Sequence, residues 1–146
     1  MSLQLSIVTA EQSVLERDDV QRLIVPTTDG QITVLPSHAA LMASIDIGEL
    51  IVVGDDGSQP IAVHGGFIQV LQDEVTVLAD AAEHADDIDE ERAEAARERA
   101  QSRIDGRATL EEVLDIARAR SAFMRAESRI RIRRRHRGTG IPAAQP

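Results

Sequence analysis

The segment Val75–Ala100, VTVLADAAEHADDIDEERAEAARERA, changes character near Asp86. Up to that residue, short apolar runs alternate with turn residues, and 14 acids stand against only 2 bases. Beyond it the chain is rich in Ala, Glu and Arg, with 14 Arg against 11 acids. Short apolar runs are typical of strands, whereas Ala, Glu and Arg favour helices. The change therefore predicts a β domain over residues 1–86 and helices over residues 87–137, and the Gly/Pro/Ala-rich end predicts a disordered tail at 138–146.

The composition of the 146-residue chain limits the classes of protein to which it can belong. Its 42% apolar content suffices for one ordinary domain with an appendage, and the core must be aliphatic because Trp and Tyr are absent. The absence of Cys excludes a disulfide scaffold and thiol chemistry. No run approaches 18 apolar residues and no signal-like leader opens the chain, so we expect a soluble protein that contacts membranes only through partners.

Strand patterns fill the first half of the chain. Leu3, Leu5 and Ile7 alternate with polar residues, which predicts a half-buried strand. Many short strands without a helical crossover between them favour a sandwich or flattened barrel. Turn residues separate the strands at 28–30, 55–57 and 72–73. Further strands are predicted at residues 21–25, 31–35, 49–53, 60–63, 66–71 and 74–79.

A helix is predicted after Asp87 or Asp89, either of which can cap its N-terminus. The acids Glu90 and Glu91 then fall in the first turn, where the helix dipole favours negative charge. We expect Gly106 to end this helix. Spacings of three and four residues place mostly small side chains on one stripe, formed by Ala93, Ala96, Ala100 and Ile104.

A second helix is predicted to begin at Thr109, which forms a capping box with Glu112. Small side chains on the first helix let the second approach closely, which favours an antiparallel hairpin. An alanine seam buries little area, at roughly 25 cal/mol per Å2 of apolar surface, so we expect a hairpin that can open. The matching stripe expected on the second helix consists of Leu110, Val113, Leu114, Ala117 and Met124.

Few residues in the chain fit a catalytic or metal-binding motif. A Walker phosphate loop needs Lys, and the chain has none. Ser37 adjoins His38, but two neighbouring residues without an orienting third group do not form a nucleophile–base pair. We expect no active site and no metal site, with His38 and His64 serving structure or an interface and Gly65-Gly66 allowing a close backbone approach. The histidines lack the spacing of a zinc site, lying at His38, His64, His84 and His136.

One group of charged residues is typical of anion binding. Asp89, Arg92 and Arg99 lie within about 80° of helical arc beside the alanine stripe. Arg125 and Arg129, four residues apart, share a face of the second helix. When the helices pack together, several guanidinium groups come near one point, and a triphosphate would suit such a cluster. The alternative is an exposed face of Glu–Arg pairs within each helix.

Five segments occur in a recognisable order: Gly30–Ala39 (GQITVLPSHA), Val63–Phe67 (VHGGF), Val75–Asp80 (VTVLAD), Ile88–Ala93 (IDEERA) and Arg125–Arg129. The fourth fits the nucleotide motif I/L-D-x-x-R-A, and the fifth has the spacing R-x-x-x-R. Together they resemble the epsilon subunit of bacterial F-type ATP synthases over essentially the whole chain. The resemblance implies a β + α fold, in which an N-terminal ten-stranded β-sandwich precedes a C-terminal antiparallel two-helix hairpin.

The resemblance also implies a function. Similar subunits are non-catalytic parts of the rotor stalk that dock on the gamma subunit and the c-subunit ring and couple proton flow to ATP synthesis. In several members the hairpin folds down when ATP binds and extends into the alpha/beta catalytic hexamer when ATP is scarce, inhibiting ATP hydrolysis. ATP would then be a regulatory ligand, and no cofactor would be required. The implied location is the cytoplasmic side of the bacterial inner membrane, held there by partners.

Functional residues follow from the resemblance position by position. The implied ATP-binding residues are Glu83, Ile88, Asp89, Arg92, Ala93, Arg99, Arg125 and Arg129. The implied interface with the c ring and gamma includes Asp29, Gly30, Gln31 and His38. Because Arg129–Arg137 holds six positive charges within nine residues, we hypothesise that the tip meets an acidic segment of the beta subunit when the hairpin extends. That contact would use Arg131, Arg133, Arg134 and Arg135.

Two other functions remain open from the sequence. A free-standing ATP-sensing module would bind ATP but no synthase subunit. A nucleic-acid binder would use the Arg-rich tail, but the acidic first half and the shortage of aromatic residues argue against base stacking. An enzyme is a more distant alternative, because no nucleophile–base pair is present. We therefore expect no nucleic-acid partner.

Overall fold

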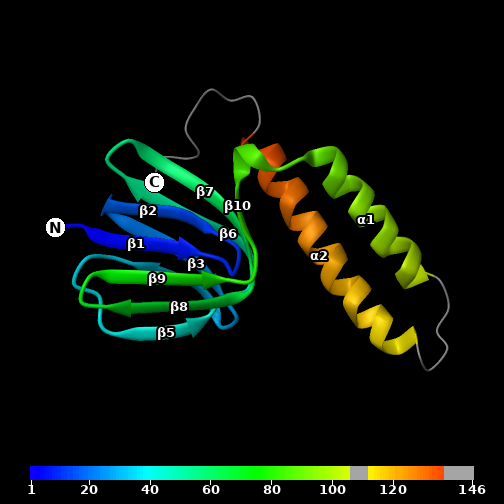
Figure 1. The fold of residues 1–146 in the computed structure, drawn as a ribbon, viewed down its shortest axis with the longest axis horizontal. Coiled ribbons are helices and arrows are strands. Elements are labelled where there is room, and N and C mark those ends of the chain that lie inside the picture. The colour runs from blue at the N-terminus through cyan, green and yellow to red at the C-terminus, as the bar shows by residue number, and fades with distance from the viewer. Residues whose placement is uncertain (106–111, 137–146) are drawn as a thin grey trace.

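The computed structural model describes residues 1–105 and 112–136. Two five-stranded sheets pack face to face, and a helical hairpin leans away from one end of this sandwich (Figure 1). The ten-stranded β-sandwich and the two-helix hairpin implied by the sequence are both confirmed. No helix among the described residues is long and apolar enough to cross a bilayer.

The first sheet has the strand order β2-β1-β9-β8-β5. Only β1 and β9 run parallel, and the other neighbours are antiparallel. Because β1 is inserted between β2 and β9, the beginning and the end of the sandwich domain are hydrogen-bonded to each other. The strands are β1 (Leu3–Val8), β2 (Ser13–Val20), β5 (Leu41–Ser44), β8 (Gly66–Leu71) and β9 (Glu74–Ala79).

The second sheet has the strand order β10-β7-β6-β3-β4 and is antiparallel throughout. Its strands are β3 (Arg22–Thr27), β4 (Gly30–Val34), β6 (Ile47–Gly54), β7 (Gly57–His64) and β10 (Ala82–His84). Strand β10 lies at the edge beside the hairpin, so it joins the sandwich to the helices (Figure 1).

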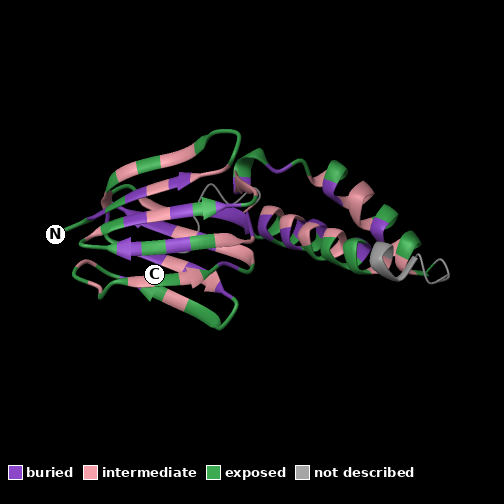
Figure 2. Cartoon of the chain, turned by 60° about the horizontal axis from the view of Figure 1, so that its bottom comes forward, coloured by how far each residue is buried: buried purple, intermediate pink, exposed green. Residues whose placement is uncertain are grey.

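An aliphatic core fills the space between the sheets. Alternate residues of several strands point inward, as Leu3, Leu5 and Ile7 do on β1. These side chains are buried, while the residues between them face outward (Figure 2). Leu, Ile and Val supply nearly the whole cluster, which confirms the aliphatic core expected from the absence of Trp and Tyr.

The predicted strands agree with seven of the observed strands. The predictions at 66–71 and 74–79 match β8 and β9 at both ends, and the others differ by a few residues. Strand patterning missed β2, β5 and β10. In β2 the run Glu16–Asp19 has four consecutive charged residues, so no alternation of apolar and polar residues is visible there. In the structure Arg17 pairs with Asp19 and Asp56 beside the sheet. The other two strands are too short to show a period.

Three helical elements follow the sandwich: η1 (Ala85–Asp87), α1 (Glu90–Asp105) and α2 (Glu112–His136). Asp89 caps α1, because its Oδ1 accepts a hydrogen bond from the backbone N–H of Arg92 at 3.1 Å. The alanine stripe of α1 is confirmed in part, since Ala93 and Ala100 are buried, while Ala96 and Ile104 are half-buried.

The stripe predicted for α2 is wrong where the structure describes it. Ala117 is exposed and the Met124 side chain is 53% exposed. Small and branched residues form the contacting face instead, because the alanines of α1 leave room only for a closely approaching helix. Predicted features at Gly106, Thr109, Leu110 and the tail 137–146 lie outside the described residues, as do the side chains of Val113 and Leu114. The buried residues of α2 are Ala119, Ala126, Ser128, Ile130 and Ile132.

Gly66 provides the close backbone approach that the sequence predicts. Its φ is +111°, and a Cβ there would lie 2.0 Å from the Leu78 carbonyl oxygen. Gly66→Ala should therefore lower the free energy of unfolding by about 3 kcal/mol or more in urea titrations followed by circular dichroism.

Gly30 is the matched control for this substitution. Its φ is +115°, but nothing lies within 4 Å of a Cβ at that position. Gly30→Ala should cost only the backbone strain, about 1 kcal/mol. Equal losses in the two variants would show that the contact with Leu78 is unimportant.

Candidate functional site

The outer face of the second sheet is the surface on which α2 docks. On β7, Ile61 and Val63 point into the sandwich core, so Ala62 and His64 point to the opposite face. Both are nevertheless buried, because α2 lies across β6 and β7. A sheet face that would otherwise meet water is thus covered by the hairpin.

Three neighbouring residues form a row across this face: Glu49 on β6, Ala62 on β7 and Glu83 on β10. Ala62 is the direct register partner of both carboxylate-bearing residues. Ile132 of α2 packs in an apolar cluster with Ala62, Ala85 and Ile88. We call Glu49, Ala62 and Glu83 the docking row, since it offers α2 an apolar centre between two carboxylates.

Charged side chains of α2 contact both ends of the docking row. Arg129 Nε donates to Glu83 Oε1. Arg135 Nη1 donates to Glu49 Oε2 at 2.5 Å, and His136 Nε2 lies 2.8 Å from Glu49 Oε1. The Glu49 side chain is largely buried by these contacts. Residues 129, 132 and 135 lie at helical spacings of three, so a single face of α2 meets the whole row.

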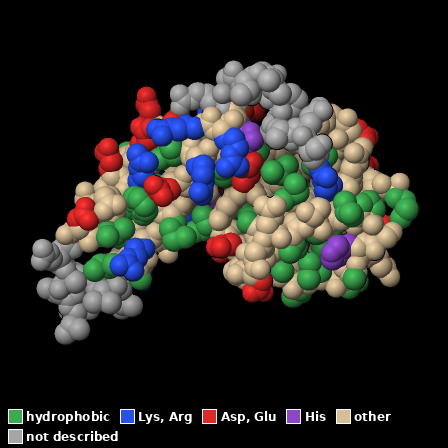
Figure 3. Space-filling view, turned by 180° about the vertical axis from the view of Figure 1, so that it is seen from behind, with side chains coloured by type: hydrophobic (Ala, Val, Ile, Leu, Met, Phe, Trp, Pro, Cys, Tyr) green, Lys and Arg blue, Asp and Glu red, His purple; other side chains and the backbone are tan. Residues whose placement is uncertain are grey.

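A second set of ion pairs joins α2 to the preceding elements. Arg134 contacts Glu90 and Glu94 of α1, each at 2.6 Å. Arg133 reaches the exposed Asp86 in η1 at 3.7 Å. Arg and acidic side chains consequently lie side by side over the hairpin (Figure 3). The last turns of α2 are therefore attached to the sandwich and to α1 together.

A hollow of about 330 Å3 lies where α1, α2 and β10 meet. Three guanidinium-bearing residues line it, two from α1 and one from α2, together with three carboxylate-bearing residues. Ala93 and Ala96 give it an apolar floor. Of the four Arg residues that spacing predicts to come together, three therefore line this one hollow. The lining residues are Glu83, Asp87, Asp89, Arg92, Ala93, Ala96, Arg99 and Arg129.

Two of the implied ATP-binding residues do not line this hollow. Ile88 is buried in the apolar cluster with Ala62 and Ile132, so its side chain serves packing. Arg125 lines a separate hollow on α2. Asp87 lines the hollow although the sequence singled it out only as a possible cap; its position two residues before Asp89 was the available signal.

The residues implied to face the c ring and gamma occupy both ends of β4. Asp29, Gly30 and Gln31 lie at the turn between β3 and β4. His38 follows the other end of β4, and its Nδ1 lies 2.7 Å from the Ala39 carbonyl oxygen. Among the residues implied to contact the beta subunit, Arg133, Arg134 and Arg135 are ion-paired in this structure. Arg131 is exposed and lines the same hollow as Arg97.

His64 has an electrostatic environment unlike that of the other histidines. Burial, and to a lesser extent the positive charges of Arg129 and Arg125, together lower the pKa of His64 to about 4. Both ring nitrogens are buried without a hydrogen-bond partner in the part of the chain that the structure describes. His84, by contrast, bonds Gln59 and the Val14 carbonyl oxygen. The docked hairpin therefore favours a neutral His64.

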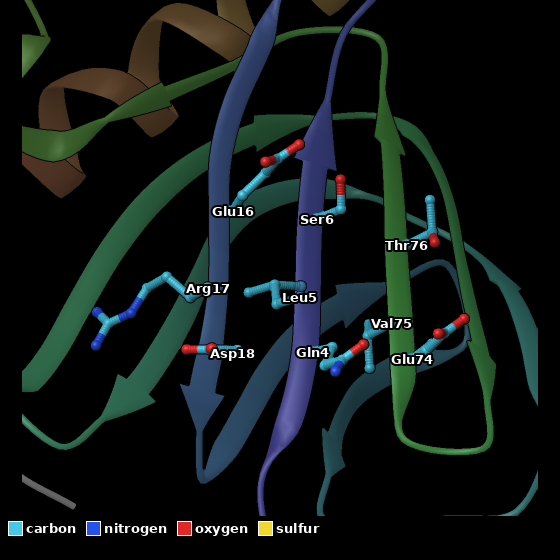
Figure 4. A pocket seen from close by; sticks show the side chains of 9 residues that line it. All are labelled: Gln4, Leu5, Ser6, Glu16, Arg17, Asp18, Glu74, Val75 and Thr76. Carbon is cyan, nitrogen blue, oxygen red and sulfur yellow. The ribbon is translucent and has the colours of Figure 1, made fainter.

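A larger hollow, of about 520 Å3, lies on the outer face of the first sheet (Figure 4). Three carboxylate-bearing residues line it, Glu16, Asp18 and Glu74, together with Gln4 and Thr76. Arg17 turns away from it in Figure 4, consistent with its pairing to Asp19 and Asp56. Such a surface repels anions. No cluster of three metal-binding side chains occurs within residues 1–105 and 112–136.

Two family descriptions match successive parts of the chain. Residues 2–85 match "ATP synthase, Delta/Epsilon chain, beta-sandwich domain", and residues 86–133 match "ATP synthase, Delta/Epsilon chain, long alpha-helix domain". An ATP synthase epsilon chain of Herpetosiphon aurantiacus is 43% identical over 90% of this chain and 94% of its own length. One from Roseiflexus is 52% identical over 66% of this chain and 68% of its own.

Two solved structures have a similar fold. One comes from the Euglena gracilis mitochondrial ATP synthase, described as OSCP/F1/c-ring, with a TM-score of 0.75 and 20% identity over 87% of this chain and 78% of the other. The second comes from the central stalk and c ring of the Tetrahymena thermophila mitochondrial enzyme, with a TM-score of 0.61 and 14% identity over 92% and 95%. At these identities the likeness concerns the fold.

Glu49→Gln tests whether the docking row holds the hairpin. The change weakens two charge-assisted hydrogen bonds at once, so docking of α2 should lose about 1–2 kcal/mol. Hydrogen exchange of the amides in residues 129–136 should accelerate accordingly, while the sandwich core remains protected.

Asp86→Asn is the matched control, because Asp86 is exposed and its pair with Arg133 is long. We expect its exchange pattern to equal that of the unmodified chain. If Glu49→Gln also leaves exchange in α2 unchanged, the docking row does not hold the hairpin.

Proposed function

The chain belongs to the ATP synthase delta/epsilon chain family, and from this premise we propose that it is a non-catalytic subunit of the central rotor stalk. Its sandwich would dock on the gamma subunit and the c ring, coupling proton flow to ATP synthesis. The complex would hold it peripherally at the cytoplasmic side of the bacterial inner membrane. The family membership is the observation that supports this function most strongly.

An apolar patch on the first sheet supports attachment to a protein partner. Phe67 on β8 and Leu78 on β9 are direct cross-strand neighbours, 56% and 54% exposed. Met42 on β5 is 68% exposed and lies beside them on the same outer face. Exposed apolar groups gathered in one place are typical of interaction sites, so we assign this patch to a stalk partner.

Co-purification from native membranes tests the rotor function. The tagged chain should recover gamma, alpha, beta and c subunits together, and Phe67→Asp should reduce their recovery at least tenfold because it places a charge in the apolar patch. Recovery of the chain alone would instead favour a free-standing ATP-sensing module.

Thr76→Asp is the matched control for this experiment. Thr76 lies on the same outer face but lines the polar hollow of Figure 4 rather than the patch. We expect it to leave recovery unchanged. Equal loss in both variants would argue against a contact centred on Phe67.

The second part of the proposal concerns the hollow between the helices and β10. Arg92, Arg99 and Arg129 can bind phosphate oxygens, and the floor of Ala93 and Ala96 can lie under a base. The volume is at the low end for small-molecule sites, which are commonly about 300–1,000 Å3. The residues thus fit ATP as a regulatory ligand.

The carboxylates of the hollow have distinct roles in this proposal. Glu83 holds Arg129 across the boundary between sandwich and hairpin. Asp89 caps α1 and fixes the start of the helix from which Arg92 projects. Glu83, Asp87 and Asp89 also limit affinity, since their charge offsets that of the three Arg residues. This balance of charge suits a ligand that binds and dissociates as its concentration changes.

Regulation follows from the construction of the hollow. Because α1, α2 and β10 all contribute to it, a ligand bound there stabilises the docked hairpin over any state in which α2 has left. In the absence of ATP the hairpin would extend into the alpha/beta hexamer and inhibit hydrolysis. Extension would free Arg133, Arg134 and Arg135 from their present pairs, adding them to the exposed Arg131 for an acidic segment of beta.

Arg99→Gln tests the ATP site. Loss of one charge-assisted phosphate contact, worth about 1.5–3 kcal/mol, should weaken ATP binding to the full chain about 10- to 100-fold in isothermal titration calorimetry. Arg97→Gln is the control, because Arg97 lies on the same helix but lines a hollow on another side. Similar affinities for all three proteins would contradict an ATP site at Arg99.

A further inference from the structure

The burial of His64 depends on the docked hairpin. It points away from the sandwich core on β7, yet it is only 4% exposed, because α2 covers that face. Neither ring nitrogen has a hydrogen-bond partner in the described part of the chain. An unpartnered buried imidazole tolerates the neutral form much better than the charged one.

The charged groups around His64 disfavour a positive charge on its ring. From α2, Arg125 and Arg129 place their positive charges near the ring. From β10, Glu83 is already paired with Arg129. From β6, Glu49 is taken by Arg135 and His136, and the direct register partner of His64 on that strand is the apolar Ile47. The two carboxylates of the docking row are therefore already paired with side chains of α2.

When α2 leaves, the His64 ring is exposed to water again and its pKa returns toward the ordinary value. We propose that His64 is a proton switch for the hairpin, in which protonation of the imidazole releases α2 from the outer face of the second sheet. The inference rests on the proposed function only in requiring that the hairpin can open, and it is independent of ATP. Acidification would then favour the extended, inhibitory form.

The direction follows from the two states of His64. Its pKa is lowered to about 4 in the docked state, mainly by burial and further by Arg129 and Arg125, against an ordinary value of 6.5. The docked state therefore binds fewer protons, and docking weakens as the pH falls from 6.5 toward 4. Between about pH 7.5 and about pH 5 the docking equilibrium constant should fall about tenfold or more.

His136 is a second titratable group on the docking face, 2.8 Å from Glu49 Oε1, and must be separated from His64. The experiment is therefore done in the chain as it stands and in the His136→Gln background. The response to acid should persist in that background.

The test uses two spin labels on the full chain, which contains no Cys of its own. Labels at Ser44→Cys on β5 and Ser121→Cys on α2 report the distance between sandwich and hairpin. Ile132→Asp supplies the undocked reference distance, because it places a charge in the apolar cluster. Circular dichroism at each pH confirms that the sandwich remains folded.

We expect the undocked fraction to rise on acidification and to stay constant in His64→Gln and in the smaller variant His64→Ser. His38→Gln, on the sandwich away from α2, should respond as the parent does. A parent that stays docked at about pH 5 while Ile132→Asp opens would overturn the inference. So would an unchanged acid response in both His64 variants.

The same labels separate this switch from the ATP response. An effect of ATP without an effect of acid overturns the proton switch and leaves ATP sensing intact. An effect of acid without an effect of ATP supports the switch and removes ATP sensing instead. Neither result changes the assignment to the rotor stalk, which depends on co-purification.

Discussion

The seating of Ile132 on Ala62, between the carboxylates of Glu49 and Glu83, is the interaction on which the rest of the hairpin depends. The seam between α1 and α2 consists largely of alanines, which bury little area and hold two helices together weakly. Docking adds apolar burial and partly buried ion pairs to that seam. It also fixes the position of α2 relative to β10, and the hollow lined by Arg92, Arg99 and Arg129 is built from both elements.

Much of the fold is predictable because local patterns dominate it. Alternation in β1 and the turn residues around β8 and β9 indicate a sandwich without any tertiary information. The face of α2 was not predictable in the same way. Met124 is more apolar than Ala119, but the seam selects side chains small enough for close approach, and α2 must satisfy the sheet as well as α1. The sequence offers two series of residues that could form the buried face of α2, and tertiary packing determines which of them is buried.

The candidate site divides along the same line. Asp89, Arg92 and Arg99 lie on one helix, so their spacing alone places them together. Arg129 comes from the other helix and is paired with Glu83 of β10, whereas Arg125 lines a separate hollow although it belongs to the same helical face by spacing. Glu49 had no signal at all. Its role arises from strand register and from the end of a helix 86 residues further along the chain.

Ligand binding in the hollow and protonation of His64 would then both shift the docking equilibrium of the hairpin. In these proposals a ligand in the hollow would favour the docked hairpin, and a proton on His64 would oppose it. The most direct measurement is calorimetric titration of ATP into the full chain and into Ile132→Asp, which retains Arg92, Arg99 and Arg129. If docking builds an ATP site, the variant should lose ATP binding although all three Arg side chains are present. Equal affinity in the two proteins would contradict that dependence.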